Sequence, residues 1–267
     1  MSQCLATVHR RTSFDRTPDA CHDTSVTTNL DRYAGQARRV AAYERWLRSS
    51  TPGAMALRWL LGPGQWASNT AIYRLAVSLK LDHTTTLLEI GCERGSVLRT
   101  LDDQLHLDVP PVGVDLSRAM LELAQRDERN PRRGAGLVQG SAMSLPLRDA
   151  TFSLVTCGYV LHDLDDDEAR ALLYEVGRVL APGGIAVMWD FGPTGNARLD
   201  AWNARVVATG GVTPRLRSAS TLRRLATEVG FPFTRDADLR PFLLPPVPRA
   251  SIMIGRPPED FDLSRLG

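Results

Sequence analysis

Lysine is almost absent from this chain. Among its 32 basic residues Lys80 is the single lysine, and it lies in no glycine-rich loop. Lysine amines form Schiff bases and hold nucleotide phosphates in P-loops, whereas arginine stays charged and does not act as a base. We therefore expect neither a Schiff-base enzyme nor a P-loop nucleotide-binding protein.

Cysteine is also scarce. The cysteines Cys4, Cys21, Cys92 and Cys157 form no CxxC pair and no group with histidine at metal-ligand spacing. The acidic run from Asp163 to Glu168 is expected to be a helix start that suits the helix dipole. We expect no disulfide framework, no metal site and a reducing, cytoplasmic location.

Long apolar runs and a dominant charge are missing as well. The longest stretch without a charged residue, 59–73, is shorter than the roughly 18 to 20 apolar residues of a membrane span, and residues 1–17 contain no apolar core of a signal peptide. The formal net charge is only +2, and 43% of the residues are hydrophobic. We expect a folded protein without a transmembrane segment, and the charge balance gives no support to a nucleic-acid-binding protein.

The length of 267 residues allows one large domain with additions. Residues 1–30 are polar, and Asp31 is placed to cap a helix in which apolar residues recur every three or four positions. Further helices are expected at 54–61 and 67–81. We divide the chain into a flexible leader (1–30), a helical segment (31–82), a main domain (83–256) that contains an insertion (192–218), and a loose tail (257–267).

Short apolar runs alternate with helical stretches in the main domain. Such runs are typical of parallel strands that are covered on both faces. The predicted fold class is therefore α/β, a doubly wound, seven-stranded, mostly parallel sheet. The expected strands are 86–90, 112–114, 137–138, 152–157, 185–189, 233–243 and 250–254, and the expected helices between them are 96–105, 118–129, 166–180 and 220–229.

The turn after the first strand carries the clearest chemical signal. Gly91 and Gly95 let the backbone turn tightly next to a ligand, and Asp115 ends the second strand, where a carboxylate can accept both hydroxyls of a ribose. The residues from Gly91 to Ser96 lack the second and third glycines of the dinucleotide fingerprint. A sulfonium cofactor tolerates the acidic Glu93 better than a pyrophosphate does, so a nicotinamide cofactor is the lesser interpretation.

Four segments resemble the motifs of the class I S-adenosylmethionine-dependent methyltransferases of the small-molecule type. They are LLEIGCERGSVL, VGVDLSRAML, QGSAMSLPLRDATFSLVTC and RVLAPGGIAVMW, and the resemblance covers roughly residues 84–192. It implies a Rossmann-like methyltransferase fold, S-adenosylmethionine as cofactor with S-adenosylhomocysteine as product, and N-terminal helices that act as a lid. The Pro182 to Gly184 segment is expected to turn into the fifth strand.

The resemblance assigns cofactor contacts to individual residues. In the family, an acidic residue and a glycine-rich turn hold the methionine part, and the second motif holds the ribose and the adenine face. Glu93 stands where the family usually has glycine, and Ser141 where it usually has aspartate. The residues expected to contact the cofactor are Glu89, Gly91, Cys92, Glu93, Gly95, Asp115, Leu116, Ser141, Ala142, Cys157 and Tyr43.

Two residues on the loop after the fourth strand are candidates for catalysis, His162 and Tyr159. A histidine near its ordinary pKa can take the proton of a hydroxyl or an acidic carbon. Two alternatives stay open: His162 only binds the backbone of the next helix, or orientation alone drives the reaction. An apolar acceptor pocket would be lined by Trp59, Trp66, Trp202, Phe191 and Met188.

These observations predict a methyltransferase that acts on the oxygen, carbon or nitrogen of a small, lipophilic or anionic molecule. Cys157-Gly158-Tyr159 stands where a methyltransferase of nucleic-acid bases would have an N-P-P-Y-type segment, which disfavours that substrate. The alternatives are a methyltransferase fold that has become a binding or regulatory protein, and, less favoured, a nicotinamide oxidoreductase. A homodimer is left open.

Overall fold

The computed structural model describes residues 25–50, 55, 76–77, 79–127, 134–208, 213–237, 239 and 249–258. The strands are β1 (Leu87–Ile90), β2 (Val112–Asp115), β3 (Gly136–Gln139), β4 (Phe152–Gly158), β5 (Leu180–Phe191), β6 (Phe233–Asp236) and β7 (Arg249–Gly255). The helices are α1 (Ser25–Arg48), α4 (Ser96–Leu105), α5 (Arg118–Asp127), the short 3-10 helix η2 (Leu161–Asp163), α6 (Asp166–Val179), α7 (Ala197–Val207) and α8 (Ala219–Val229). None of the described helices is long and apolar enough to cross a membrane.

The strands form one sheet of seven in the order β3-β2-β1-β4-β5-β7-β6. The five strands from β3 to β5 are parallel, and β7 runs antiparallel to both β5 and β6. The chain passes outward from β1 to β3 and then returns to β4, so the order reverses between β1 and β4. Ligands bind at the carboxyl ends of strands on either side of such a reversal. The predicted seven-stranded, mostly parallel fold is confirmed.

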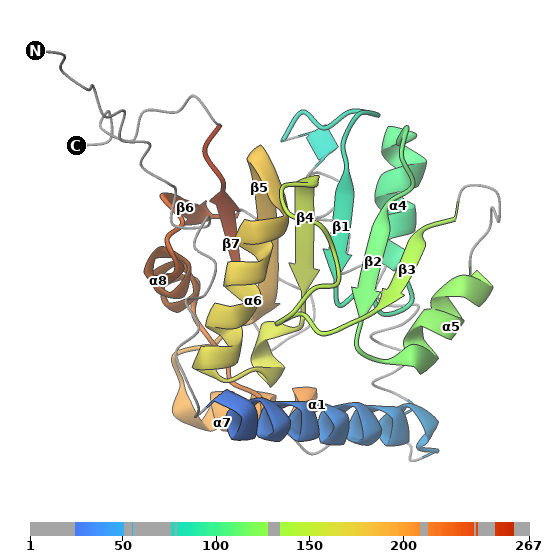
Figure 1. Ribbon diagram of the computed structural model, residues 1–267. Coiled ribbons are helices and arrows are strands. Elements are labelled where there is room, and N and C mark those ends of the chain that lie inside the picture. Colours follow the sequence, from blue (N-terminus) through green and yellow to red (C-terminus); the bar gives the residue numbers. More distant parts are fainter. Residues whose placement is uncertain are drawn as a thin grey trace, which may run out of the picture.

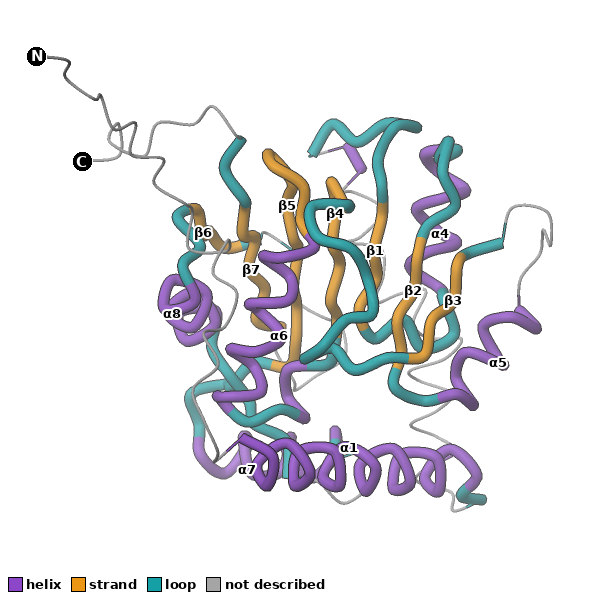
Figure 2. Tube along the Cα trace, in the orientation of Figure 1, coloured by secondary structure: helices purple, strands orange, loops and turns teal. Residues whose placement is uncertain are grey.

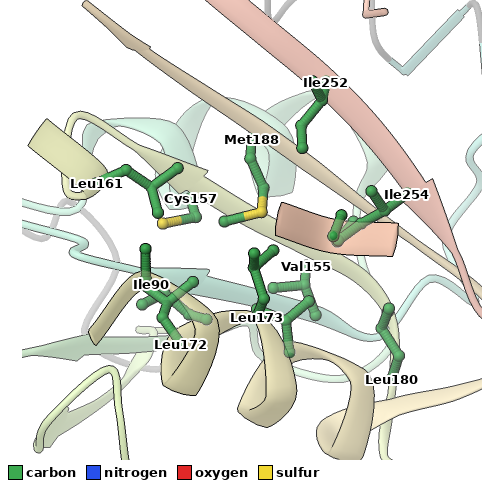
Figure 3. Close-up of a cluster of buried hydrophobic side chains, with 14 of the residues drawn as sticks. Ile90, Val155, Cys157, Leu161, Leu172, Leu173, Leu180, Met188, Ile252 and Ile254 are labelled. Atoms are coloured by element: carbon green, nitrogen blue, oxygen red, sulfur yellow. The ribbon is translucent and has the colours of Figure 1, made fainter. Parts of the chain in front are cut away.

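Helices cover both faces of the sheet, and each face has its own hydrophobic core (Figure 1). On one face, Leu172 and Leu173 of α6 pack against Val155 and Met188 (Figure 3). On the other face, Leu98 of α4 belongs to a second cluster of buried residues. Burial on both sides explains why the parallel strands are almost wholly apolar in sequence.

Local capping sets where the helices begin and end. The side chain of Asp165 accepts a hydrogen bond from the backbone of Glu168, and the Glu168 side chain accepts one from the backbone of Asp165, which together make a capping box at the start of α6. Ser218 caps α8 in a similar way, and Gly230 ends that helix with a φ of 108°. The predicted helix start within the acidic run from Asp163 to Glu168 is confirmed, with Asp165 as the capping residue.

Helix α1 crosses the edge of the sheet where the parallel strands end (Figure 2). Its side chains reach the segments that follow β2, β3 and β4: Glu44 accepts a hydrogen bond from Ser117, Gln36 donates to Ser141, and Arg39 pairs with Glu168. The helix therefore covers the edge at which a ligand is expected.

Several predicted boundaries are wrong. Helix α1 begins at Ser25, so Asp31 lies inside the helix and does not cap it. The insertion 192–218 contains a further helix, α7, which Asn196 caps and which its weak apolar period did not predict. Strand β5 begins at Leu180, and the glycines after Pro182 form an irregular part of the strand, next to a register shift against β4, instead of a turn before it.

Two other expectations concern segments that are short or not described. Strand β6 ends at Asp236, so only the beginning of the predicted strand 233–243 is a strand within the described residues. The predicted helices 54–61 and 67–81, the tail beyond residue 258 and most of the leader lie outside the described residues.

Candidate functional site

The glycine-rich turn after β1 adopts a conformation that requires glycine. Gly91 has a φ of 72°, and a Cβ atom built on it would lie 2.3 Å from Cγ2 of Val160. Gly95 has a φ of 69° and begins α4. The turn is fixed by backbone hydrogen bonds from Gly91 and Cys92 to the carbonyl oxygen of Val114. The first and second predicted motifs are therefore held side by side.

Asp115 at the end of β2 ties two loops of the site together, the turn after β1 and the segment after β2. Its Oδ2 accepts a hydrogen bond from the backbone of Glu93 at 2.9 Å, and its Oδ1 accepts one from the backbone of Ser117 at 2.8 Å. Burial raises the pKa of the Asp115 carboxyl, and these backbone donors oppose that rise. Each carboxylate oxygen keeps further lone pairs for hydroxyl donors.

Glu89 and the two described cysteines, Cys92 and Cys157, are buried below the glycine-rich turn and Asp115. Glu89 is 5% exposed, and its Oε2 accepts a hydrogen bond from the backbone of Leu98 in the first turn of α4. Burial, followed by the charge of Glu93, raises the pKa of Glu89 well above its usual value. Burial also raises the pKa of the thiols of Cys92 and Cys157, so both remain protonated and unreactive.

A cavity of about 140 Å³ lies between α1 and the carboxyl ends of the strands. Residues of the segments at the ends of β1, β2, β3 and β4 line the cavity, together with the α1 side chains Gln36 and Arg39. Five predicted cofactor residues share this cavity: Gly91, Asp115, Leu116, Ser141 and Ala142. Glu89, Cys92, Glu93, Gly95, Cys157 and Tyr43 are not among the residues that line it.

Ser141 is already hydrogen-bonded by protein groups. Its Oγ accepts hydrogen bonds from Nε2 of Gln36 at 3.1 Å and from the backbone of Met143 at 3.2 Å. Gln36 therefore occupies one of the hydrogen-bonding positions of Ser141, the residue that the resemblance assigns to the cofactor.

Glu93, the residue in place of a family glycine, has a φ of 45° in the left-handed region. Its side chain forms a hydrogen bond with the hydroxyl of Tyr43. Burial of Tyr43, and then the charges of Glu93, Asp115 and Asp163, raise the pKa of the tyrosine. The tyrosine stays a neutral donor that connects α1 with the glycine-rich turn.

His162 is buried and paired with Asp190 at the end of β5. Its Nδ1 lies 2.8 Å from Oδ1 of Asp190, and its backbone N–H donates to Oδ2 at 2.8 Å. Burial disfavours the charged ring, but the negative charge of Asp190 and its hydrogen bond outweigh burial and raise the pKa of His162 to about 9. The open alternative, in which the ring only binds the backbone of the next helix, is not what the structure shows.

Tyr159 and His162 lie on either side of Phe191. The ring of Tyr159 lies 4.6 Å from that of Phe191, and the ring of His162 meets it edge-on at 5.0 Å. The Tyr159 hydroxyl accepts a hydrogen bond from Nη2 of Arg249 at 2.9 Å. Burial raises the pKa of Tyr159, although Arg249 opposes the rise. Two aromatic rings and two basic side chains therefore gather near the carboxyl ends of β4 and β5 and the start of β7.

The predicted apolar acceptor pocket is only partly represented. Met188 is fully buried in the core (Figure 3), whereas Trp202 on α7 is 50% exposed. Trp59 and Trp66 lie outside the described residues. A larger cavity of about 590 Å³ lies along β6 and β7, and no predicted site residue lines it.

Sequence reasoning missed four side chains at the site. Asp190 ends a strand as Asp115 does, and that position is a usable signal. Gln36, Arg39 and Arg249 carry no local signal, because only the folded chain brings them to loops that lie from 90 to 129 positions away. The described residues hold no group of three or more metal-ligating side chains.

Comparison with known proteins agrees with this geometry. Residues 87–184 match the family model of a methyltransferase domain. A demethylmenaquinone methyltransferase of Lactiplantibacillus plantarum is 38% identical over 103 residues, which are 38% of this chain and 43% of the relative. A 2-phytyl-1,4-naphtoquinone methyltransferase of Thermosynechococcus vestitus is 33% identical over 114 residues, 42% of this chain and 49% of the relative. The chain thus matches less than half the length of these relatives.

Solved structures share the fold. An S-adenosylmethionine-dependent methyltransferase of Methanosarcina mazei has a TM-score of 0.56 at 20% identity and covers 68% of this chain and 97% of its own. The cyclase SpnF has a TM-score of 0.53 at 18% identity, covering 70% of this chain and 80% of its own. Residues 87–184 thus match a methyltransferase domain, in agreement with the predicted resemblance, and the fold is one that solved methyltransferase structures share.

Proposed function

We propose that this protein transfers a methyl group from S-adenosylmethionine to a small-molecule acceptor. The observation that carries the proposal is the cavity at the carboxyl ends of the strands, where Gly91 and Asp115 lie together under α1. The same loops carry the family's first two motifs. Cofactor sites in open α/β sheets lie at this edge.

The donor set of the cavity fits the proposed cofactor. Asp115 offers lone pairs for a ribose diol, and Gly91 brings backbone close to the ligand without a side chain. Ligand sites usually have volumes of roughly 300–1,000 Å³, so the cavity of about 140 Å³ is too small for the whole cofactor. Binding therefore requires α1, with Gln36 and Arg39, to shift away from the loops.

The acceptor that the site favours is an aromatic molecule with a hydroxyl group. Phe191 and Tyr159 offer aromatic faces, while His162 and Arg249 supply positive charge. The names of the relatives, which refer to menaquinone and naphthoquinone chemistry, support the same class. Within this proposal the protein does not act on nucleic acid, which the even charge balance supports. It acts in the cytoplasm, which the protonated, buried Cys92 and Cys157 support. A homodimer is compatible with it, and sedimentation equilibrium tests that point.

Calorimetry with S-adenosylmethionine and S-adenosylhomocysteine tests the function. We expect binding by the wild-type protein and at least about a tenfold weaker affinity in Asp115→Ala, because the carboxylate that accepts the ribose hydroxyls is removed. Asp108→Ala is the matched control, since Asp108 is exposed and pairs only with His83 within the described residues. Unchanged affinity in Asp115→Ala would remove the ribose assignment, and no heat with either ligand would remove the proposed function.

The two alternatives make different predictions in the same assay. A binding protein that has lost catalysis binds the cofactor but gives no methylated product, and a nicotinamide oxidoreductase binds NAD(P)H instead. SpnF, a cyclase of the same fold, illustrates that the fold alone does not fix the reaction. The comparisons give no support to either alternative.

A further inference from the structure

The gap between two side chains of η2, His162 and Asp163, is the most informative feature that the cofactor site leaves unused. Oδ1 of Asp163 is buried and has no hydrogen-bond partner within the described residues. Nε2 of His162 lies 3.6 Å from it, which is too far for a hydrogen bond. A buried carboxylate oxygen without a partner is costly, so its presence points to a ligand group that completes the pair.

Both ring nitrogens of His162 face carboxylates. Nδ1 is bonded to Asp190 at 2.8 Å, and Nε2 faces Asp163. An ionised carboxylate only accepts hydrogen bonds, so this arrangement favours a ring with a proton on each nitrogen. In that state His162 is a donor and cannot take a proton from an acceptor molecule, which leaves the predicted role of general base to another group.

Asp163 has the position and access that such a base needs. Asp163 lines the cavity that also contains Gly91 and Asp115, and its side chain as a whole is 32% exposed; Oδ1 itself is buried, so an acceptor reaches it only after the shift of α1 that the proposed function requires. Its backbone is held in place, because Arg39 donates to the Asp163 carbonyl oxygen at 3.0 Å and the Asp163 N–H donates to Val160. Asp163 had been expected only as part of a solvated helix start.

We propose that Asp163 is a catalytic residue that accepts the proton of a hydroxyl-bearing acceptor, while doubly protonated His162 stabilises the oxyanion that forms, and that Asp190 is the positioning residue for His162. The inference deepens the proposed function and rests on it. A hydroxyl that enters beside these two atoms, which are too close for an oxygen to lie between them, donates to Oδ1 of Asp163 and accepts from Nε2–H of His162. Every polar group at the gap then has a partner.

The reaction balances with these groups alone. S-adenosylmethionine supplies the methyl group on a sulfonium, which leaves as a neutral thioether. The acceptor O–H bond breaks and its proton moves to Oδ1 of Asp163. The oxygen electron pair forms the new bond to the methyl carbon as the S–C bond breaks and leaves its electron pair on sulfur. In a phenol the ring carbon beside the oxygen can form that bond instead; Asp163 then returns its proton to the oxygen, and the proton of that carbon passes to solvent, which restores the aromatic ring.

The surrounding charges suit these roles. Burial raises the pKa of Asp163, and the charge of Asp190 adds to the rise, whereas His162 and Arg39 oppose it. The net rise makes Asp163 a stronger base than an ordinary aspartate. Glu93, from the turn after β1, adds negative charge that favours the protonated ring of His162.

The first test measures the charge of His162 without any ligand. We expect ¹⁵N NMR at pH 7.5 to show two protonated ring nitrogens in the wild-type protein and a neutral ring in Asp190→Asn. A neutral His162 in the wild-type protein would overturn the proposal. This readout does not depend on cofactor binding, so it is informative even when the proposed function fails.

The second test uses 4-nitrophenol as an optical probe with protein that is saturated with S-adenosylhomocysteine. At the pH where the free probe is half ionised, we expect the wild-type protein to bind the neutral phenol, because ionised Asp163 accepts a hydrogen bond from its hydroxyl and repels the phenolate, and to reduce the phenolate absorbance. Asp163→Asn carries no charge and accepts no proton, so it should prefer the phenolate and shift the ratio of the two affinities by at least about tenfold. Asp163→Ser serves as a second variant if Asp163→Asn does not fold.

Asp167→Asn is the matched control, because Asp167 lies on the same helix start but is 79% exposed. It should behave as the wild-type protein does. Three results would each overturn the inference. The first is the same ratio of phenol to phenolate affinity in the wild-type protein, Asp163→Asn and Asp167→Asn. The others are a preference of the wild-type protein for phenolate, and no binding of the probe at millimolar concentration. Calorimetry on the same samples separates a failure of this inference from a failure of the proposed function. If the proposed function is wrong, the protein does not bind S-adenosylhomocysteine.

Discussion

At the scale of single residues, the site depends on backbone conformations that few side chains tolerate. Gly91 and Gly95 have positive φ angles, and so do Glu93 and Tyr159, which are not glycine. In Glu93 and Tyr159 such a conformation lowers the stability of the fold by roughly 1–3 kcal/mol each, and residues of this kind are found mainly at functional sites. Glu93 takes up this cost where relatives of the same family usually have glycine, and in return its carboxylate bonds Tyr43 of α1.

Replacement of Gly91 by alanine should destabilise the fold by more than about 3 kcal/mol, since a left-handed alanine costs about 1–2 kcal/mol and the new Cβ overlaps Val160. Urea denaturation measures the loss. Gly195→Ala is the matched control, because Gly195 has a φ of 82° but open space around its Cα, so it should cost only about 1 kcal/mol. Val160→Ala should restore part of the stability in the Gly91→Ala background. Equal losses in the two alanine variants would contradict the overlap.

At the scale of elements, α1 covers the cavity and also occupies hydrogen-bonding positions that the proposed cofactor would use. Gln36 and Arg39 line the cavity, and the partners of α1 belong to the loops after β2, β3 and β4. These contacts join elements that are far apart in sequence. The helix therefore covers the cavity, and the proposed binding of the cofactor requires it to give up some of these hydrogen bonds.

Removal of the Gln36 side chain should therefore strengthen cofactor binding. The Ser141 hydroxyl loses its α1 partner in Gln36→Ala and becomes free for the adenine edge. A hydrogen bond contributes about 0.5–1.5 kcal/mol net, which corresponds to an affinity gain of about two- to tenfold for S-adenosylhomocysteine by calorimetry. Gln104→Ala, on the exposed side of α4, is the control and should leave the affinity unchanged. A weaker affinity in Gln36→Ala would instead make Gln36 a ligand of the cofactor.

The elements were predicted well where local sequence decides them. Helices α4 and α8 and strands β1 to β4 lie within one or two residues of their expected bounds, because caps and short apolar runs mark both ends. Helix α7 was missed because exposed residues such as Trp202 break its apolar period. The expected cofactor residues that line the cavity came from motif positions, whereas Asp190 and Gln36 were missed, since their contacts exist only after distant segments meet.

At the scale of the whole molecule, the net charge of +2 conceals an uneven distribution. Residues 81–192 are acidic, and the segments before and after them are basic. The fold explains the separation: Arg39 from the first segment pairs with Glu168, and Arg217 from the last segment pairs with Asp166. Arg217 also donates to the carbonyl oxygens of Leu161 and Leu164, on both sides of His162. Part of the basic charge thus holds the flanking segments against the acidic site.

The buried pair of His162 and Asp190 should make the stability of the whole molecule depend on pH. The pKa of His162 is raised from an ordinary 6.5 to about 9 in the folded protein, so the folded state binds a proton that the unfolded state releases between these values. The stabilisation is complete below about pH 6.5 and is lost as the pH rises through 9, amounting to about 3 kcal/mol in all. Urea denaturation from pH 6 to 9.5 should show this loss in the wild-type protein and a much smaller one in His162→Gln.

His83→Gln is the matched control for this pH dependence. His83 also pairs with an aspartate, Asp108, at 2.9 Å, but this pair is exposed, so the substitution should leave the wild-type slope almost unchanged. The same slope in all three proteins would show that the buried pair does not hold the proton.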